Sequence, residues 1–178
     1  MSEPRWLDEH EHLAWLNLLT VMEMVPAAVD AQLRRDHGIT RFEYYVLAML
    51  SDREDGTRPM TDLSVLTNGS LSRLSHAVAK LEGRGWVTRR PSQEDRRTSL
   101  VTLTAEGMAL LVRAAPSHVE EVRRLLFDVI PASAVPVLSE ILSPVVTGCL
   151  GEGKAWDAGK AAPAALPSGD AGRDAPAA

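Results

Sequence analysis

The sequence predicts a mainly α-helical protein with a small β-hairpin wing, arranged as a winged helix-turn-helix between N- and C-terminal helices. Two short helical segments joined by a Gly-containing turn are typical of a helix-turn-helix. Two β-branched segments directly after the second helix predict the hairpin. Long segments at both ends repeat apolar residues at helical spacing. The predicted domain covers residues 1–150, and its central lobe covers about 40–107.

The N-terminal segment 6–36 is predicted to be one long helix because its leucine, methionine and alanine residues recur at helical spacing. Pro26 lies inside it and is expected to kink or interrupt the helix, since proline donates no backbone hydrogen bond. Gly38 supplies a stop. Thr40 and Glu43 have the capping-box spacing and begin a second helix, and 52–59 is predicted to be a polar loop.

Residues 61–84 predict the helix-turn-helix. Thr61 is expected to cap a short helix over 62–66, 67–69 forms the turn, and Ser70 is a favoured N-cap for the next helix. The apolar residues of that second helix follow steps of three, four and three, and are predicted to face the core: Leu71, Leu74, Val78 and Leu81.

The opposite face of this second helix carries small polar and basic residues. An arginine can bond both acceptors of a guanine, serine contacts bases or phosphates, and a helix N-terminus favours a phosphate. A solvated surface is the commoner explanation of one basic helix, but the order helix, turn, helix, hairpin favours DNA binding. The candidate DNA-binding residues on the helix are Ser70, Ser72, Arg73, Ser75, His76 and Lys80.

The hairpin is predicted from strands over 86–90 and 98–103 around a polar turn. Arg89, Arg90, Arg96 and Arg97 lie on it, which is more charge than protection of a strand edge requires. We therefore expect the hairpin to contact the minor groove or phosphates. Asp95 has two interpretations: it pairs with Arg97 and stabilises the tip, or it is an ordinary turn residue.

The C-terminal part predicts a helix from 104 towards 128 and another over about 133–146. Their apolar residues exceed what one chain's short helices bury, so the terminal helices are predicted to be dimerisation helices. Residues 151–178 predict a disordered tail, because Ala, Gly and Pro make up most of it and no apolar periodicity remains.

Composition narrows the class of function. The net charge is −5, but residues 71–97 hold seven basic against three acidic side chains, a local balance of +4. One cysteine, Cys149, and histidines without chelating spacing predict no metal site and no cofactor. No phosphate-binding Gly loop or nucleophile elbow is present, which argues against an enzyme. No apolar run approaches the ~20 residues of a membrane span, so a cytoplasmic protein is expected.

Four segments together resemble the MarR family of bacterial transcriptional regulators. They are Met60-Thr61-Asp62-Leu63, the run from Ser72 to Val87 containing Leu-Glu-Gly-Arg-Gly-Trp-Val, Asp95-Arg96-Arg97, and the run from Val101 to Gly107. The resemblance extends from about Trp6 to Val146, with Pro26 and the Ala-rich tail as departures.

The resemblance implies a homodimer whose two lobes straddle a palindromic operator in double-stranded DNA. It implies that the Ser70 helix enters the major groove, that Arg96 and Arg97 reach the minor groove, and that Asp95 and Arg97 form a salt bridge in the wing. It further implies a small-molecule effector cleft between the dimerisation helices and the lobe. Trp15, Tyr44 and Tyr45 are candidate lining residues, although core packing explains them equally well.

The first hypothesis is therefore a sequence-specific transcriptional regulator, a repressor that a small ligand releases from DNA. The alternative is a winged-helix protein-interaction module that does not bind DNA. A metal- or thiol-responsive sensor is a third hypothesis, which Cys149 and the scattered histidines support poorly.

Overall fold

The computed structural model describes residues 3–93 and 98–150. The predicted tail over 151–178 and the tip of the wing, which includes Asp95, Arg96 and Arg97, lie outside the described residues.

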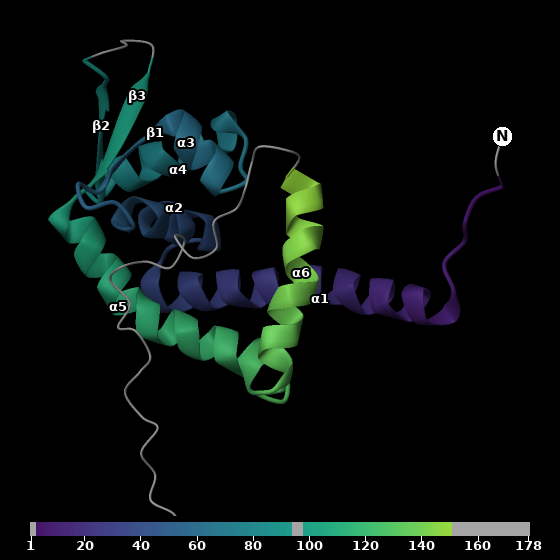
Figure 1. Cartoon of the computed structure of the whole chain (residues 1–178). Helices are drawn as coiled ribbons and strands as arrows, with labels where there is room; N and C mark the ends of the chain where they lie inside the picture. Colours follow the sequence, from purple (N-terminus) through teal and green to yellow (C-terminus); the bar gives the residue numbers. More distant parts are fainter. Residues whose placement is uncertain (1–2, 94–97, 151–178) are drawn as a thin grey trace, which may run out of the picture.

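The N-terminal helix α1 spans Glu9–His37 (Figure 1). A capping box between Asp8 and Glu11 begins it, and Gly38, at φ +65°, ends it in the left-handed conformation that glycine adopts without strain. The expectation that Pro26 interrupts the helix is wrong, since α1 continues through it. The helix packs against α2 and α5 along its second half, and these contacts hold the segment helical beyond the proline.

By length and composition alone, α1 is apolar enough to cross a membrane. The prediction that no segment reaches this length is therefore corrected. A single such helix near a chain start is weak evidence for a membrane, because helices that bury an apolar face against protein pass the same test.

The central lobe contains α2 (Arg41–Ser51), β1 (Thr57–Pro59), α3 (Met60–Leu66), α4 (Leu71–Gly83), β2 (Val87–Pro91) and β3 (Ser99–Leu103). The strands form an antiparallel sheet in the order β1-β3-β2. Strand β1 lies where the sequence predicts a loop, because its extended residues pair with β3, with Arg58 opposite Val101. Helix α3 begins at Met60 with no side-chain cap, so the predicted capping role of Thr61 is wrong.

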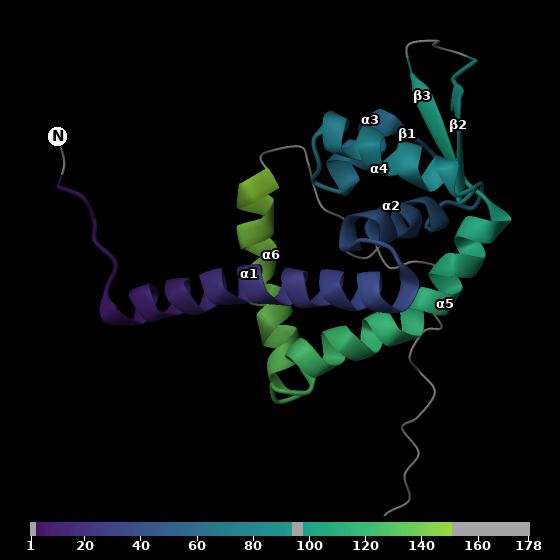
Figure 2. The same cartoon turned by 180° about the vertical axis from the view of Figure 1, so that it is seen from behind.

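Helix α5 (Ala105–Val122) leads into a π-helical segment, Arg123–Phe127, and then to α6 (Ala134–Leu150). The helix predicted to continue regularly towards 128 therefore changes its hydrogen-bonding pattern after Val122. Figures 1 and 2 show α6 running away from the end of α5, and every side chain of residues 139–149 is exposed.

Helix α2 is the centre of the core. It lies between the α3–α4 pair and the α1–α5 pair in both views (Figures 1 and 2). Nine of its 11 residues are buried, including the fully buried Val46, Leu47 and Leu50. A helix that is apolar on all sides needs partners on all sides. The contacts of α2 with α1, α3, α4, α5 and β3 supply them.

A close contact joins the wing to α5. Thr104 caps α5 by accepting a hydrogen bond from the N–H of Gly107 (3.1 Å), and its own hydroxyl donates to the carbonyl of Gly85 (2.7 Å). A Cβ at Gly107 would lie 2.1 Å from the carbonyl oxygen of Trp86. Only glycine therefore lets the first turn of α5 lie against the start of β2.

Replacing Gly107 by alanine is expected to lower the free energy of unfolding by about 2–3 kcal/mol, the upper part of the range for overpacked contacts. Gly83→Ala is the matched control, because nothing lies within 4 Å of a Cβ there. We expect that control to leave stability unchanged or raise it by about 0.5–1 kcal/mol. Urea denaturation at one fixed protein concentration measures both. Equal stabilities of the two variants would contradict the close approach.

Candidate nucleic-acid interface

Helix α4 is amphipathic, with one face in the core. Ser70 caps it by accepting a hydrogen bond from the N–H of Arg73 (3.2 Å), which confirms the predicted helix start. Its buried residues are Leu74, Ala77, Val78 and Leu81. Leu71 was expected among them, but it is 54% exposed. The first turn of α4 extends past the core, so an apolar residue there meets solvent.

The face of α4 opposite the core is small and polar. Ser72 and His76 are exposed, one helical turn apart, together with Ala79. Ser75 is half-buried at the edge of this face. Since short side chains surround one histidine, the helix can approach another surface closely. Ser72 and His76 are predicted site residues that the structure places on the exposed side of α4.

Arg73 and Lys80 lie together on a different side of α4, towards α2. The guanidinium carbon of Arg73 lies 4.2 Å from the centre of the Phe42 ring, a cation–π distance. The ammonium of Lys80 lies 2.7 Å from a carboxylate oxygen of Glu43, whose side chain is only 5% exposed. Both basic residues therefore help to hold α4 on α2, in addition to the predicted role at DNA.

Sequence reasoning missed Phe42 and Glu43 as partners of α4. The other carboxylate oxygen of Glu43 accepts a hydrogen bond from the N–H of Thr40 (2.8 Å). Phe42 also contacts the helix-turn-helix turn, where a Cβ at Gly69 would lie 2.7 Å from its ring. One feature of the sequence indicates that these two basic residues act together: Arg73 and Lys80 are seven residues apart and therefore share a helix face. Their partners on α2 are set by the tertiary fold.

Among the described residues, the arginines of the wing lie on β2. Arg89 and Arg90 are exposed, and the sheet alternation does not bury either of them. The backbone N–H of Arg89 donates to Glu82 (3.1 Å), which ties β2 to the last turn of α4. The guanidinium of Arg89 lies 3.8 Å from the same carboxylate. The last turn of α4 and strand β2 are thus connected directly.

Tyr44 and Tyr45, predicted to line an effector cleft, lie on α2, and Tyr44 packs against α5. Tyr44 is buried, and its ring centre is 4.5 Å from that of His118. Burial raises the pKa of Tyr44 to about 12, raises the pKa of Tyr45, and lowers the pKa of His118. The structure does not bring Trp15 to them within one protomer. Trp15 is 47% exposed and lies 17 residues before Gln32, about 25 Å along α1.

The junction of α1, α2 and α5 around Tyr44 contains buried polar atoms without hydrogen-bond partners among the described residues. They are Oε1 of Gln32, the hydroxyl of Tyr44 and Nδ1 of His118. Ser117 connects the same junction, since it lies 2.8 Å from Nε2 of His37 and accepts from Gln32 (3.2 Å). Buried polar atoms are normally hydrogen-bonded, so these three atoms are exceptions among the buried groups that the structure describes.

Exposed apolar side chains gather on α1 and α6. On α1 they occupy the half that projects beyond the other helices (Figure 1), and on α6 they recur at helical spacing. The exposed large apolar residues of the two helices are Leu13, Trp15, Leu16, Val21, Met22, Met24, Val137, Ile141, Leu142, Val145 and Val146. Exposed apolar side chains gathered in this way are typical of surfaces that another molecule covers.

Among the described residues, no three His, Cys, Asp or Glu side chains are grouped as a metal site would require. Cys149 is exposed near the end of α6.

A capped amphipathic helix after a tight turn, followed by an arginine-bearing hairpin, defines a winged helix-turn-helix DNA-binding regulator. The MarR family model matches residues 37–98. PecS of Dickeya dadantii, an HTH-type transcriptional regulator, is 31% identical over 123 residues, which are 67% of this chain and 72% of PecS. A further curated relative is matched over only 47% of its own length. The chain belongs to the MarR family.

Solved structures agree with this assignment. The MarR family regulator Sco3205 of Streptomyces coelicolor, solved in complex with DNA, is 36% identical, with a TM-score of 0.80. The match covers 85% of this chain and 95% of Sco3205. CouR of Rhodococcus jostii RHA1, solved with p-coumaroyl-CoA, is 26% identical, with a TM-score of 0.65 over 79% of this chain and 95% of CouR. The protein is a DNA-binding transcriptional regulator and not an enzyme.

The contact between α4 and α2 predicts that Lys80→Met destabilises the protein by about 1–3 kcal/mol, because a buried carboxylate would lose its cationic partner. Combining it with Glu43→Gln should recover part of the loss in a double-mutant cycle. Arg123→Met is the control, since its ion pair with Asp128 is exposed, and no measurable change is expected. Urea denaturation of the parent, the two single variants, the double variant and the control measures these effects. A Lys80 variant as stable as the control would show that the ion pair does not secure α4.

Proposed function

We propose that the protein is a sequence-specific repressor that binds a palindromic operator as a homodimer and leaves it when a small ligand binds. The observation that carries this proposal is the exposed polar face of α4 beside the arginines of β2. The cytoplasm, where a bacterial chromosome lies, is the corresponding location.

DNA recognition would use the two surfaces differently. Ser72, His76 and the N-terminus of α4, capped by Ser70, form a narrow polar face suited to the major groove. Arg73 and Lys80 flank that face, and Ser75 lies at its other edge. Arg89 and Arg90 lead towards the tip of the wing, for which the sequence predicts further phosphate or minor-groove contacts by Arg96 and Arg97. The solved DNA complex of Sco3205 supports this use of the fold.

A homodimer would bury the apolar surfaces of α1 and α6. Ile141 is 60% exposed and Met24 is 65% exposed, and a single chain offers no described element that covers them. A twofold dimer places one α4 in each half, and two equal reading helices match a DNA site with two equal halves.

Release from DNA would follow from a ligand that fits one arrangement of the terminal helices better than another. The unsatisfied polar atoms around Tyr44, at the junction of α1, α2 and α5, support a ligand there. Tyr45 lies on the same helix, whereas Trp15 of α1 does not reach this junction within one protomer. CouR, a structural relative, has been solved with p-coumaroyl-CoA, which supports ligand binding by this fold.

Binding to the DNA upstream of its own gene should fall steeply with salt, with a slope of about −0.9 for each phosphate neutralised. Arg90→Ala should weaken binding to all sequences evenly and flatten the slope by about 0.9, as for one lost phosphate contact. Arg73→Ala should instead erode the preference for the operator, at about 1–3 kcal/mol. Fluorescence anisotropy over a range of salt concentrations measures each effect.

Arg123→Ala is the control, because it removes the same charge from the end of α5 distant from the wing (Figure 1). Its salt slope should equal that of the parent. A flat salt dependence, or no binding to any DNA, would contradict the proposal and favour a protein-interaction module built on the same fold.

Ile141→Glu is expected to convert the dimer into a monomer, because it places a charge within the apolar face of α6. Ser139→Glu puts the same charge on a polar, exposed position of α6 and should leave the dimer intact. Analytical ultracentrifugation at micromolar concentration distinguishes the two states. If Ile141→Glu remains dimeric, α6 does not form the proposed interface.

A further inference from the structure

Leu71 departs from the burial pattern of the other apolar residues of α4. It begins the row that continues with Leu74, Val78 and Leu81, and those three side chains are completely buried. Leu71 is 54% exposed instead. A single exposed leucine is common on protein surfaces, so exposure alone indicates no function. The position of Leu71 is informative, because it is the first residue of the helix that we propose to read DNA.

The neighbours of Leu71 belong to the small, polar side of α4. Ser72 is the next residue, and Ser75 lies one helical turn beyond Leu71. His76 lies one turn beyond Ser72 in the same way. These four side chains therefore form one surface over the first two turns of α4. Of the four, only Leu71 is large and apolar.

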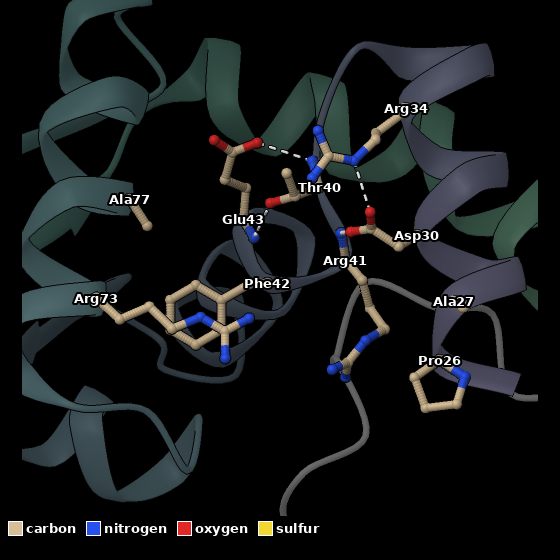
Figure 3. Close-up of a pocket in the computed structure, with 10 residues that line it drawn as sticks. All are labelled: Pro26, Ala27, Asp30, Arg34, Thr40, Arg41, Phe42, Glu43, Arg73 and Ala77. Atoms are coloured by element: carbon tan, nitrogen blue, oxygen red, sulfur yellow. Dashed lines mark hydrogen bonds and ion pairs between the residues drawn. The ribbon is translucent and has the colours of Figure 1, made fainter. Parts of the chain in front are cut away.

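The arginine and the lysine of α4 that were predicted to contact DNA lie away from this surface, towards α2. Figure 3 shows the guanidinium of Arg73 over the Phe42 ring, in a cleft between α1, α2 and α4 that Arg41 also lines. Lys80 is paired with Glu43 of α2. In this arrangement, the first two turns of α4 offer a base edge two short hydroxyl side chains, one imidazole and one apolar side chain.

The first turn of α4 also carries no acidic residue. Helices α1, α2 and α5 each have a glutamate there, where the helix dipole stabilises negative charge. An acid beside Leu71 would repel the phosphates of an approaching duplex. The cap by Ser70 and the contact between Phe42 and Gly69 hold the start of the helix in place, so the position of Leu71 is set before DNA binds.

We propose that Leu71 is a specificity-determining residue that contacts the C5-methyl group of a thymine in the major groove. This inference rests on the proposed function, because it requires α4 to be the reading helix. Among the four bases, thymine alone presents a methyl group at the major-groove edge. Packing that methyl group against Leu71 removes apolar surface from water and neutralises no charge. The contact therefore adds a preference for thymine and leaves the salt dependence of binding unchanged.

Replacing thymine by uracil tests the contact, because uracil lacks only the C5-methyl group. Selection from random duplexes with the full-length protein first gives the preferred half-site. Uracil at one thymine position of that half-site should weaken binding about fourfold, the equivalent of about 0.8 kcal/mol for one buried carbon group. Fluorescence anisotropy measures this ratio, which should be the same at low and at high salt.

Three variants test whether Leu71 is responsible. Leu71→Ala should bind the thymine and uracil duplexes equally and unfold at the same urea concentration as the parent, since the side chain is exposed. Leu71→Met keeps a long apolar side chain and should retain the preference for thymine. Val65→Ala is the matched control, because Val65 of α3 is similarly exposed (51%), and it should behave like the parent. A thymine preference that survives in Leu71→Ala, or that Val65→Ala also removes, would overturn the proposal.

The same measurements separate the role of Leu71 from the proposed function. A parent protein that selects a half-site but binds its thymine and uracil forms equally contradicts the role of Leu71 and leaves sequence-specific binding intact. A parent protein that enriches no sequence contradicts the proposed function and the role of Leu71 together.

Discussion

The placement of α4, the proposed reading helix, depends on the interactions of the buried Glu43 carboxylate. One of its oxygens closes the first turn of α2 through the N–H of Thr40, and the other meets the ammonium of Lys80 from α4. A carboxylate with 5% of its side chain exposed is stable only when such partners replace water. Because α2 is the core helix, the contact fixes α4 relative to the whole lobe.

Phe42 extends the same constraint to the turn before α4. Its ring contacts Gly69 and lies beneath the guanidinium of Arg73. The first turn of α2 therefore contacts residues on both sides of Ser70, the cap of α4. The last turn of α4 is connected in turn to β2, through Glu82 and the backbone of Arg89. Small shifts of α2 would move the reading helix and the wing together, since packed elements transmit displacement.

A single protomer leaves many apolar side chains of α1 and α6 uncovered. Its lobe buries a continuous core around α2, while the projecting half of α1 and nearly all of α6 leave apolar side chains exposed. In the proposed dimer the same surface would account for the apolar composition of α1, since a helix that buries much of its surface against protein is apolar over that surface. The proposed dimer and the proposed ligand both involve α1, and α2 connects α1 to α4.

Local interactions explain which features could be predicted from the sequence. Caps, turns and helical periodicity join residues three or four apart, so Thr40, Ser70 and Thr104 identified three helix starts correctly. The hairpin could also be predicted from the sequence, since its two strands are neighbours along the chain. Strand β1 was not, because Thr57–Pro59 are extended only by pairing with β3. Pro26 likewise remains helical because α1 packs against α2 and α5.

The sequence by itself determined the order of the elements and which residues form the small, polar face of α4. Both depend on spacing along the chain. Only the tertiary structure decided the directions of Arg73 and Lys80, whose partners Phe42 and Glu43 come from another helix. Only the tertiary structure places Arg41 and Arg73 along the same cleft, and only it shows that Leu71 is exposed at the first turn of α4. The physical reason is that a periodic pattern assigns a residue to a face, whereas packing between helices decides what that face meets.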